Sequence, residues 1–251
     1  MKTITSKRIF AILLSLLMIF SLAACRSGDQ VTTGNGGSTD SQNTNAGGNG
    51  SSASGNNSNT NSSATSGGRI LIAYFSRVGN TVWDEGVDVV ASASLNLQNG
   101  DYVGNAEVLA KMAQQATGGD LFLIQTVEPY PSDYRQTTDK ASVEQSQKAR
   151  PALSSHVENM ENYDTIILIY PNWWGTLPQP LFTFLEEYDF SGKTILPLCT
   201  HAGSRMGSSE RDIRSLCPDA TLGSGLAVSG SSVNSARSDV EKWLKNAGLI
   251  G

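Results

Sequence analysis

The sequence of 251 residues has few of the side chains from which metal and nucleophilic sites are built. It contains three cysteines and two histidines, and no cysteine belongs to a Cys-x-x-Cys pair or to a recognisable zinc spacing. We therefore predict no metal site. The Gly-x-Ser-x-Gly elbow of many serine hydrolases is also missing, and two histidines leave little choice of a general base. A hydrolase is therefore a poor interpretation.

Positive charge is also scarce over most of the chain. Residues 69–251 contain 14 Lys and Arg against 21 Asp and Glu, a formal charge of about −7. Proteins that bind nucleic acid usually carry a basic patch or an excess of basic residues. The balance argues against nucleic acid as a partner. It suits acidic electron carriers, although acidity is equally common in exported bacterial proteins.

Residues 1–25 have the pattern of an export signal. A basic start is followed by an apolar stretch over residues 9–22, and Leu-Ala-Ala-Cys at 22–25 resembles the cleavage motif of bacterial lipoproteins. Cleavage there would leave Cys25 as an acylated N-terminus, which anchors the chain to the outer face of the cytoplasmic membrane. The alternative is a plain secretory signal with a chance cysteine. We favour the lipoprotein because Cys25 falls where the cleavage site belongs.

The next segment, residues 26–68, has almost no aliphatic side chains and is built mostly from Gly, Ser, Asn and Thr. Such a composition cannot bury enough apolar surface to offset the entropy of ordering, so we expect a disordered, flexible tether. Residues 69–251 are the size of one domain. In this domain Cys199 and Cys217 could form a disulfide, although burial as a free thiol is the preferred interpretation for Cys199, which ends an apolar run.

Strands and helices are predicted to alternate along this domain. Short apolar runs are typical of strands buried on both faces of a parallel sheet. Between them lie segments rich in helix formers, at 106–115, 138–149, 179–188, 209–216 and 235–246. The alternation predicts an α/β fold, a doubly wound sheet of five parallel strands in the order 2-1-3-4-5 with helices on both faces. The five runs are 70–75, 121–125, 165–170, 194–199 and 222–228.

In such a sheet, ligands bind beyond the carboxyl ends of strands 1, 3 and 4. The first of these strands leads directly into a turn with Ser76, Gly79 and Thr81. This turn has neither the Gly-Lys-Ser/Thr of a Walker A loop nor the Gly-x-Gly-x-x-Gly of dinucleotide-binding folds. Its hydroxyls and backbone N–H groups could still hold a phosphate. The alternative is an ordinary junction between a strand and a turn.

The turns after strands 3 and 4 are unusual too. Residues 171–178 place Trp173 and Trp174 side by side between prolines and a glycine. We expect one indole to lie in the core and the other to stack on a flat aromatic ligand, the alternative being two core residues. Residues 200–207 intersperse glycines with hydroxyls, which suggests backbone pressed against a ligand. His201 there could contact the ligand or face solvent.

These three loops resemble the flavin-binding loops of the flavodoxin family in kind, order and spacing. The likeness is to the branch found in bacterial lipoproteins and small secreted proteins, and it covers residues 69–251. It implies a flavodoxin-like fold with FMN as the cofactor. By position, it assigns the FMN phosphate to Ser76, Arg77, Val78, Gly79, Asn80 and Thr81. It assigns the ring and its ribityl chain to Pro171, Asn172, Trp173, Trp174 and Gly175. It assigns the other edge of the ring to Thr200, His201, Ala202, Gly203 and Ser204.

Two departures from the family pattern stand out. Arg77 adds a charge to a loop that often has only hydroxyls and amides, and it could pair with phosphate or point outward. Residues 82–104 separate the loop from the helix that would support the phosphate. Either a short helix begins at Thr81 and breaks at Gly86, or the insertion folds over the cofactor. We hypothesise that Trp83 shields one side of the flavin.

The resemblance implies an electron-transfer flavoprotein without catalytic side chains, because the flavin supplies the chemistry. Its partner would be a redox protein or a small electron donor or acceptor. An FMN-dependent NAD(P)H oxidoreductase acting on quinones, nitro or azo compounds is the main alternative. A cofactor-free binding module is the second.

Overall fold

The computed structural model describes residues 68–88 and 91–251. The predicted export signal, Cys25 and the tether lie outside these residues, apart from Gly68 at the tether's end. Strand β1 (Arg69–Tyr74) follows directly and occupies an interior position of the sheet. No helix in the described part of the chain is long and apolar enough to cross a membrane.

The main sheet is parallel and has the predicted order. Strand β1 lies between β4 (Asp120–Leu123) and β5 (Tyr163–Pro171), and β6 (Thr194–His201) pairs with β5. The outer position beside β6 is filled by β7 (Thr221–Leu222) and β8 (Leu226–Ser229). Counted along the chain, these positions read 2-1-3-4-5, which confirms the doubly wound α/β sheet.

The fifth strand was predicted as one run and is interrupted by residues 223–225. A side chain at Gly223 would begin 2.2 Å from Leu196 Cδ2, so the backbone approaches β6 closely there. The Ser224 carbonyl accepts a hydrogen bond from Trp243 Nε1 at 2.7 Å instead of joining the ladder. The two halves, β7 and β8, pair with opposite ends of β6.

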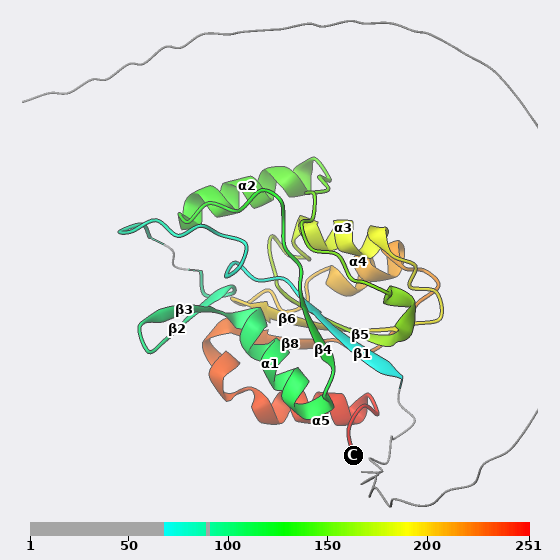
Figure 1. Ribbon diagram of the computed structural model, residues 1–251. Coiled ribbons are helices and arrows are strands. Elements are labelled where there is room, and N and C mark those ends of the chain that lie inside the picture. Colours follow the sequence, from blue (N-terminus) through cyan, green and yellow to red (C-terminus); the bar gives the residue numbers. More distant parts are fainter. Residues whose placement is uncertain (1–67, 89–90) are drawn as a thin grey trace, which may run out of the picture. The chain divides into compact units, whose positions relative to one another are not determined.

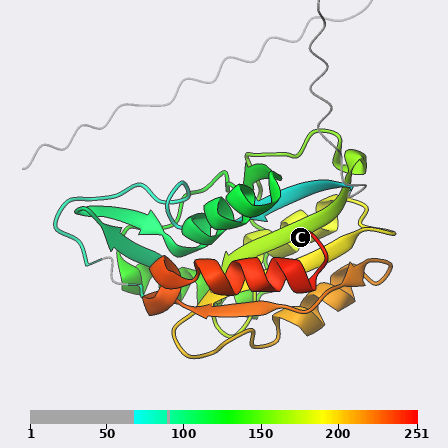
Figure 2. The ribbon, with the colours of Figure 1, turned by 90° about the horizontal axis from the view of Figure 1, so that it is seen from below.

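Both faces of the sheet are buried, as the apolar runs predicted. Leu71, Ile166 and Leu168 belong to one core, and Ile72 and Ile167 to the other, because successive side chains of a strand point to opposite faces. Helices α1 (Asn105–Thr117) and α5 (Arg237–Asn246) cover one face side by side (Figures 1 and 2). The other face carries α2 (Tyr134–Ser146), α3 (Gln179–Glu187) and α4 (Ser209–Leu216).

The start of α2 differs from the prediction by four residues. It begins at Tyr134 because Asp133 caps it, accepting a hydrogen bond from the Gln136 N–H at 2.7 Å. Such a side-chain acceptor satisfies an N–H that has no partner inside the helix. Two short 3₁₀ helices, Met160–Asn162 and Gly230–Ser235, complete the helical elements of the described residues.

The insertion contains an antiparallel hairpin that the sequence analysis did not predict. Strands β2 (Leu95–Gln98) and β3 (Asp101–Gly104) are joined through Asn99 and Gly100, both with positive φ, as two-residue hairpin turns require. Residues 81–88 form no helix, so the expectation of a short helix from Thr81 is wrong. A small cluster of Val78, Trp83, Ala91 and Leu95 holds the insertion against the end of β1.

Candidate functional site

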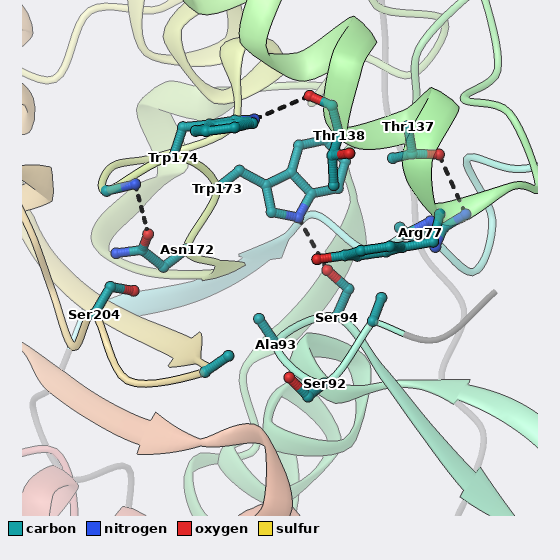
Figure 3. A pocket seen from close by; sticks show the side chains of 14 residues that line it. Arg77, Ser92, Ala93, Ser94, Thr137, Thr138, Asn172, Trp173, Trp174 and Ser204 are labelled. Carbon is teal, nitrogen blue, oxygen red and sulfur yellow. Dashed lines mark hydrogen bonds between the residues drawn. The ribbon is translucent and has the colours of Figure 1, made fainter. Parts of the chain in front are cut away.

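A cavity of about 420 Å³ lies at the carboxyl ends of β1, β5 and β6, where ligands bind in doubly wound sheets (Figure 3). Five segments far apart in the sequence form its walls. They are Arg77 after β1, residues 91–94 of the insertion, the first turns of α2, residues 172–175 after β5, and Ala202 and Ser204 after β6.

The two tryptophans after β5 have different surroundings. Trp173 is half-buried and makes edge-to-face contacts with Phe75 and Tyr130, at centroid distances of 5.4 and 5.1 Å. Trp174 is 55% exposed and lines the cavity mouth, where its Nε1 donates to the Thr138 carbonyl at 3.0 Å. One indole therefore belongs largely to the core, and the other is available to stack on a ligand.

A tight turn holds these indoles in place. Trp174 and Gly175 both have positive φ, 51° and 83°, and the Asn172 carboxamide oxygen accepts from the Gly175 N–H at 3.0 Å. The Asn172 amide donates to the Arg205 carbonyl at 2.8 Å, which joins this turn to the loop after β6. Pro171 is buried at the end of β5 and positions the turn without lining the cavity.

The loop after β6 contributes to the cavity through Ala202 and Ser204. Thr200 is buried and donates to the Ala93 carbonyl at 2.6 Å, so it supports the insertion's wall of the cavity. His201 accepts from the Gly203 N–H through Nδ1 at 2.9 Å and lies outside the cavity wall. Burial and the neighbouring Arg205 lower the pKa of His201, which keeps the imidazole neutral near pH 7.

The turn after β1 divides into two parts. Asn80 faces β4: its amide donates to the carbonyls of Ser76 and Ile124 at 2.9 Å each, and its oxygen accepts from the Thr126 N–H. Thr81 bridges to Tyr130, and Gly79 lies against Leu123 of β4. Residues 79–81 thus join the ends of β1 and β4, although Thr81 Oγ1 is buried without a hydrogen-bond partner among the described residues, and of this turn Arg77 lines the cavity.

The end of the insertion brings a helix N-terminus back to Ser76. Gly104 precedes α1, and a side chain there would begin 1.9 Å from Ser76 Oγ. Asn105 donates through its side chain to the Ser92 carbonyl at 2.9 Å. Ser76 Oγ and Asn105 Oδ1 are buried without a hydrogen-bond partner among the described residues. The positive end of the α1 dipole therefore lies beside β1, with unpaired polar atoms next to it.

Sequence reasoning did not identify Gly104 or Asn105 individually, and its hypothesis that the insertion folds over the ligand named Trp83 rather than residues 91–94, which line the cavity. A signal was present, since Gly-Asn directly precedes the helix-forming segment at 106–115. That arrangement is typical of a helix start. Trp83, predicted to shield a ligand, does not line the cavity; its ring stacks on Tyr102 at a centroid distance of 5.7 Å and lies 5.2 Å from the Arg77 guanidinium carbon.

Arg77 turns inward, with only 1% of its surface exposed. Its Nη2 donates to the carbonyls of Pro131 and Ser132 at 2.9 Å each and to Thr137 Oγ1 at 3.3 Å (Figure 3). Nε and Nη1 have no partner among the described residues. Burial lowers the pKa of Arg77, against the smaller opposing effect of the Asp133 charge, but an arginine still stays protonated in proteins.

A second buried pair lies beneath α2. The Tyr130 hydroxyl donates to Glu144 Oε2 at 2.7 Å, and Lys140 Nζ lies 4.7 Å from the centroid of the Tyr130 ring. Burial raises the pKa of Glu144. The two cysteines of the domain are both free and buried, which raises the pKa of Cys199 to about 12 and that of Cys217 to about 11.

These features fit a ligand with two chemically different ends. The indoles and the apolar cavity wall suit a flat aromatic group. The buried, unpaired polar atoms beside the α1 N-terminus suit negative charge. The residues present therefore fit an aromatic ligand that carries an anionic group.

Comparison with known proteins identifies the family. The flavodoxin sequence model matches residues 100–247, more than half of the chain. A flavoprotein structure from Bacteroides uniformis is 30% identical, covering 71% of this chain and 99% of its own, with a TM-score of 0.55. One from Bacteroides eggerthii is 28% identical, covering 69% and 98%, with a TM-score of 0.50.

A flavoprotein from Lactobacillus acidophilus, solved in complex with FMN, is 19% identical over 70% of this chain and 99% of its own, with a TM-score of 0.49. Comparison with curated proteins gives no match. The family match spans β3 to α5, and the sheet order is the one that the resemblance implied. On these findings, the chain belongs to the flavodoxin family.

Proposed function

We propose that this protein binds FMN in the cavity at the ends of β1, β5 and β6 and transfers electrons through it. One observation carries the proposal. The exposed indole of Trp174 lines the cavity, and the opposite wall at Ser92 accepts a hydrogen bond from Asn105 at the start of α1, where Ser76 Oγ and Asn105 Oδ1 are buried and unpaired among the described residues. Membership of the flavodoxin family supports FMN in particular.

The phosphate would be held where α1 begins. Ser76 Oγ supplies a hydroxyl, and the first turn of α1 supplies N–H groups and the positive end of the helix dipole. Gly104 lacks a side chain, which lets the helix N-terminus approach Ser76. Residues 79–81, predicted to contact the phosphate, would act indirectly by fixing the end of β1 against β4.

The ring would lie against Trp174, with Trp173 behind it and residues 202–204 along its other edge. When bound, the flavin supplies the chemistry of electron transfer. The chain's own residues bind it, orient it and exclude water from one side. Residues 91–94 close the cavity near the α1 end, because Ser94 Oγ accepts from Trp173 Nε1 at 2.9 Å and Thr200 holds the Ala93 carbonyl.

The absorption spectrum of the purified full-length chain tests FMN binding. We would extract the chain with a mild detergent and release any chromophore by denaturation. One FMN per chain is the expected result. A colourless protein that stays colourless when FMN is added contradicts the proposal and favours a binding module.

The carrier and the NAD(P)H oxidoreductase differ in how the flavin is reduced. Anaerobic mixing with NADH or NADPH should bleach the flavin slowly in a carrier, whose electrons come from another donor. Rapid, saturable bleaching would identify the oxidoreductase instead. We favour the carrier because the cavity wall offers only Arg77 and Tyr134 as titratable groups among the described residues.

We also propose that the protein is exported and tethered by a lipid on Cys25, so that the domain reaches a redox partner near the membrane. The support is the sequence at 22–25 together with the long polar segment that follows. In a bacterial host, the Cys25→Ala variant should leave the membrane fraction or remain unprocessed. Unchanged retention and processing would contradict lipidation.

A further inference from the structure

Arg77 is a buried cation without a carboxylate partner. The acceptors of its Nη2 are two backbone carbonyls and a threonine hydroxyl, and no ion pair within 4.0 Å involves it in the described part of the chain. Its guanidinium carbon lies 5.2 Å from the centroid of the Trp83 ring, but burying a cation with no opposite charge beside it is unfavourable. Its other two nitrogens, Nε and Nη1, are buried and have no hydrogen-bond partner among the described residues. The surroundings of Arg77 therefore favour an anionic or electron-rich group in the cavity.

Two observations place Arg77 away from the phosphate. Ser76 and Arg77 are consecutive residues of the turn that follows β1, but their side chains contact different helices. Ser76 Oγ lies beside Gly104 at the start of α1, whereas Arg77 donates to residues at the start of α2. Figure 1 shows α1 and α2 on opposite faces. Under the proposed function, the phosphate is held at the start of α1, on the side of the sheet away from Arg77.

The contacts of α2 place Arg77 beside the predicted ring site. Thr137 accepts from Arg77 through its hydroxyl, and the next residue, Thr138, accepts from Trp174 Nε1 through its carbonyl. Consecutive residues of one helix thus hold both the buried cation and the exposed indole, and all four residues line the cavity (Figure 3).

We propose that Arg77 binds the ring of FMN rather than its phosphate, and that its charge favours the reduced ring and raises the reduction potential. This inference rests on the proposed function. Two-electron reduction of the ring takes up two electrons and, when the ring nitrogen N1 stays ionised, one proton. The reduced ring therefore carries one more negative charge than the oxidised ring. A neighbouring cation binds the reduced form more tightly, and charge near N1 is a known means of tuning flavins.

The test compares the two redox states of FMN bound to the full-length chain. With dithionite as the reductant and a redox dye as the reference, we expect Arg77→Gln to weaken binding of reduced FMN about tenfold more than binding of oxidised FMN. A tenfold difference in affinity corresponds to about the free energy that a charge-assisted hydrogen bond contributes. For a two-electron couple, tenfold corresponds to a fall of about 30 mV in the midpoint potential. Arg77→Lys keeps the charge and should retain most of the potential.

A matched control tests whether removing any positive charge from this region changes the two affinities as the removal of the buried Arg77 charge does. Arg135→Gln removes an exposed cation from the same helix, where the side chain is 89% exposed and pairs with Asp139 only at 4.0 Å. Solvent screens such a charge, so the ratio of the two affinities should change less than about twofold. If Arg135→Gln changes the ratio of the two affinities as much as Arg77→Gln does, the proposal is contradicted.

Riboflavin, which lacks the phosphate, distinguishes the two possible partners of Arg77. We expect Arg77→Gln to leave the ratio of FMN to riboflavin affinity unchanged, and Ser76→Ala to lower it. If Arg77→Gln lowers that ratio and leaves the potential unchanged, Arg77 binds the phosphate and the proposal fails. It also fails if both flavins and both redox states lose affinity equally, since Arg77 would then act only by holding α2. Absence of flavin binding in the unmodified chain would instead overturn the proposed function.

Discussion

The two helices nearest to the end of β1 are held in place by different interactions. Helix α1 buries Ala106, Leu109, Ala110 and Ala113 against the sheet, so apolar contact fixes it. Helix α2 buries Thr137, Ala141 and Glu144, two of them polar. Hydrogen bonds hold it instead, from Arg77, Tyr130 and Trp174.

The difference matches the two tasks that we assign to the ends of the cavity. On the α1 side, a helix N-terminus is held in place by buried apolar residues, which suits a phosphate that is bound in every redox state. The α2 side offers a cation and an indole held through polar contacts, which respond to charge. The residues that we assign to phosphate binding and those that we assign to adjusting the reduction potential thus lie on opposite faces of the sheet.

Removing apolar volume from α1 should have the largest effect. Leu109 is fully buried in the core between α1, β1 and β5, so Leu109→Ala should lower the free energy of unfolding by about 3 kcal/mol. Urea denaturation followed by circular dichroism measures the loss. Val143→Ala on α2 is the control, because Val143 is exposed and its loss should stay within about 0.5 kcal/mol. If the two variants lose the same free energy of unfolding, apolar contact does not distinguish α1 from α2.

On the α2 side, the next largest effect should come from a polar group. Tyr130→Phe removes the hydroxyl that donates to the buried Glu144 carboxyl at 2.7 Å, so it should cost about 2 kcal/mol. Tyr134→Phe removes a hydroxyl from an exposed residue at the start of the same helix and should change the unfolding free energy little. If the two losses measured in urea are the same, the buried pair does not hold α2.

A smaller effect is expected at the cavity mouth. Trp174→Ala should weaken FMN binding about tenfold, or about 1.4 kcal/mol, because it removes the exposed stacking surface. Its effect on unfolding should be slight. Tyr102→Ala removes another exposed aromatic residue, one that lies outside the cavity wall, and should leave the affinity unchanged. Fluorescence titration with FMN measures both. Unaltered binding in Trp174→Ala would contradict the stacking role.

The sheet was predictable from sequence because its strands are buried on both faces. Continuous apolar runs such as Ile166–Tyr170 occur where no side of a strand meets water, and their alternation with helical segments sets the order. The hairpin of the insertion was not predictable in the same way. Its four-residue strands include polar Asn96 and Gln98 and exposed Leu97, so no apolar periodicity marks them.

The site was predicted in outline, with its details set by tertiary contacts. The contrast between Trp173 and Trp174 was expected from the unusual pair alone, and the structure shows it. The turn after β1 was read as one phosphate loop, yet Asn80 turns to β4 and Arg77 to α2. The return of α1 to Ser76 depends on how the insertion folds, which local sequence does not specify. Whether these residues bind FMN stays a prediction.

The smallest expected effect concerns the protonation of Glu144. Burial raises the pKa of this carboxyl above its ordinary value of 4.5, more than the hydrogen bond from Tyr130 and the charge of Lys140 lower it. The folded protein therefore binds this proton more tightly than the unfolded chain does. Its contribution to stability is fully present below pH 4.5 and is lost as the pH rises through the raised pKa of the folded state.

Glu144→Gln carries no titrating proton and keeps an oxygen that can accept from Tyr130. Relative to the unmodified chain, the variant's free energy of unfolding should therefore rise as the pH increases from 4.5 through the raised pKa of the folded state, and then level off. Urea denaturation across this range measures the difference, with Glu158→Gln at an exposed position as the control for lost negative charge. A difference that does not change with pH would mean that Glu144 is ionised alike in both states. Helix α2 would then be held by a permanent charge, and its polar attachment would not depend on pH at this residue.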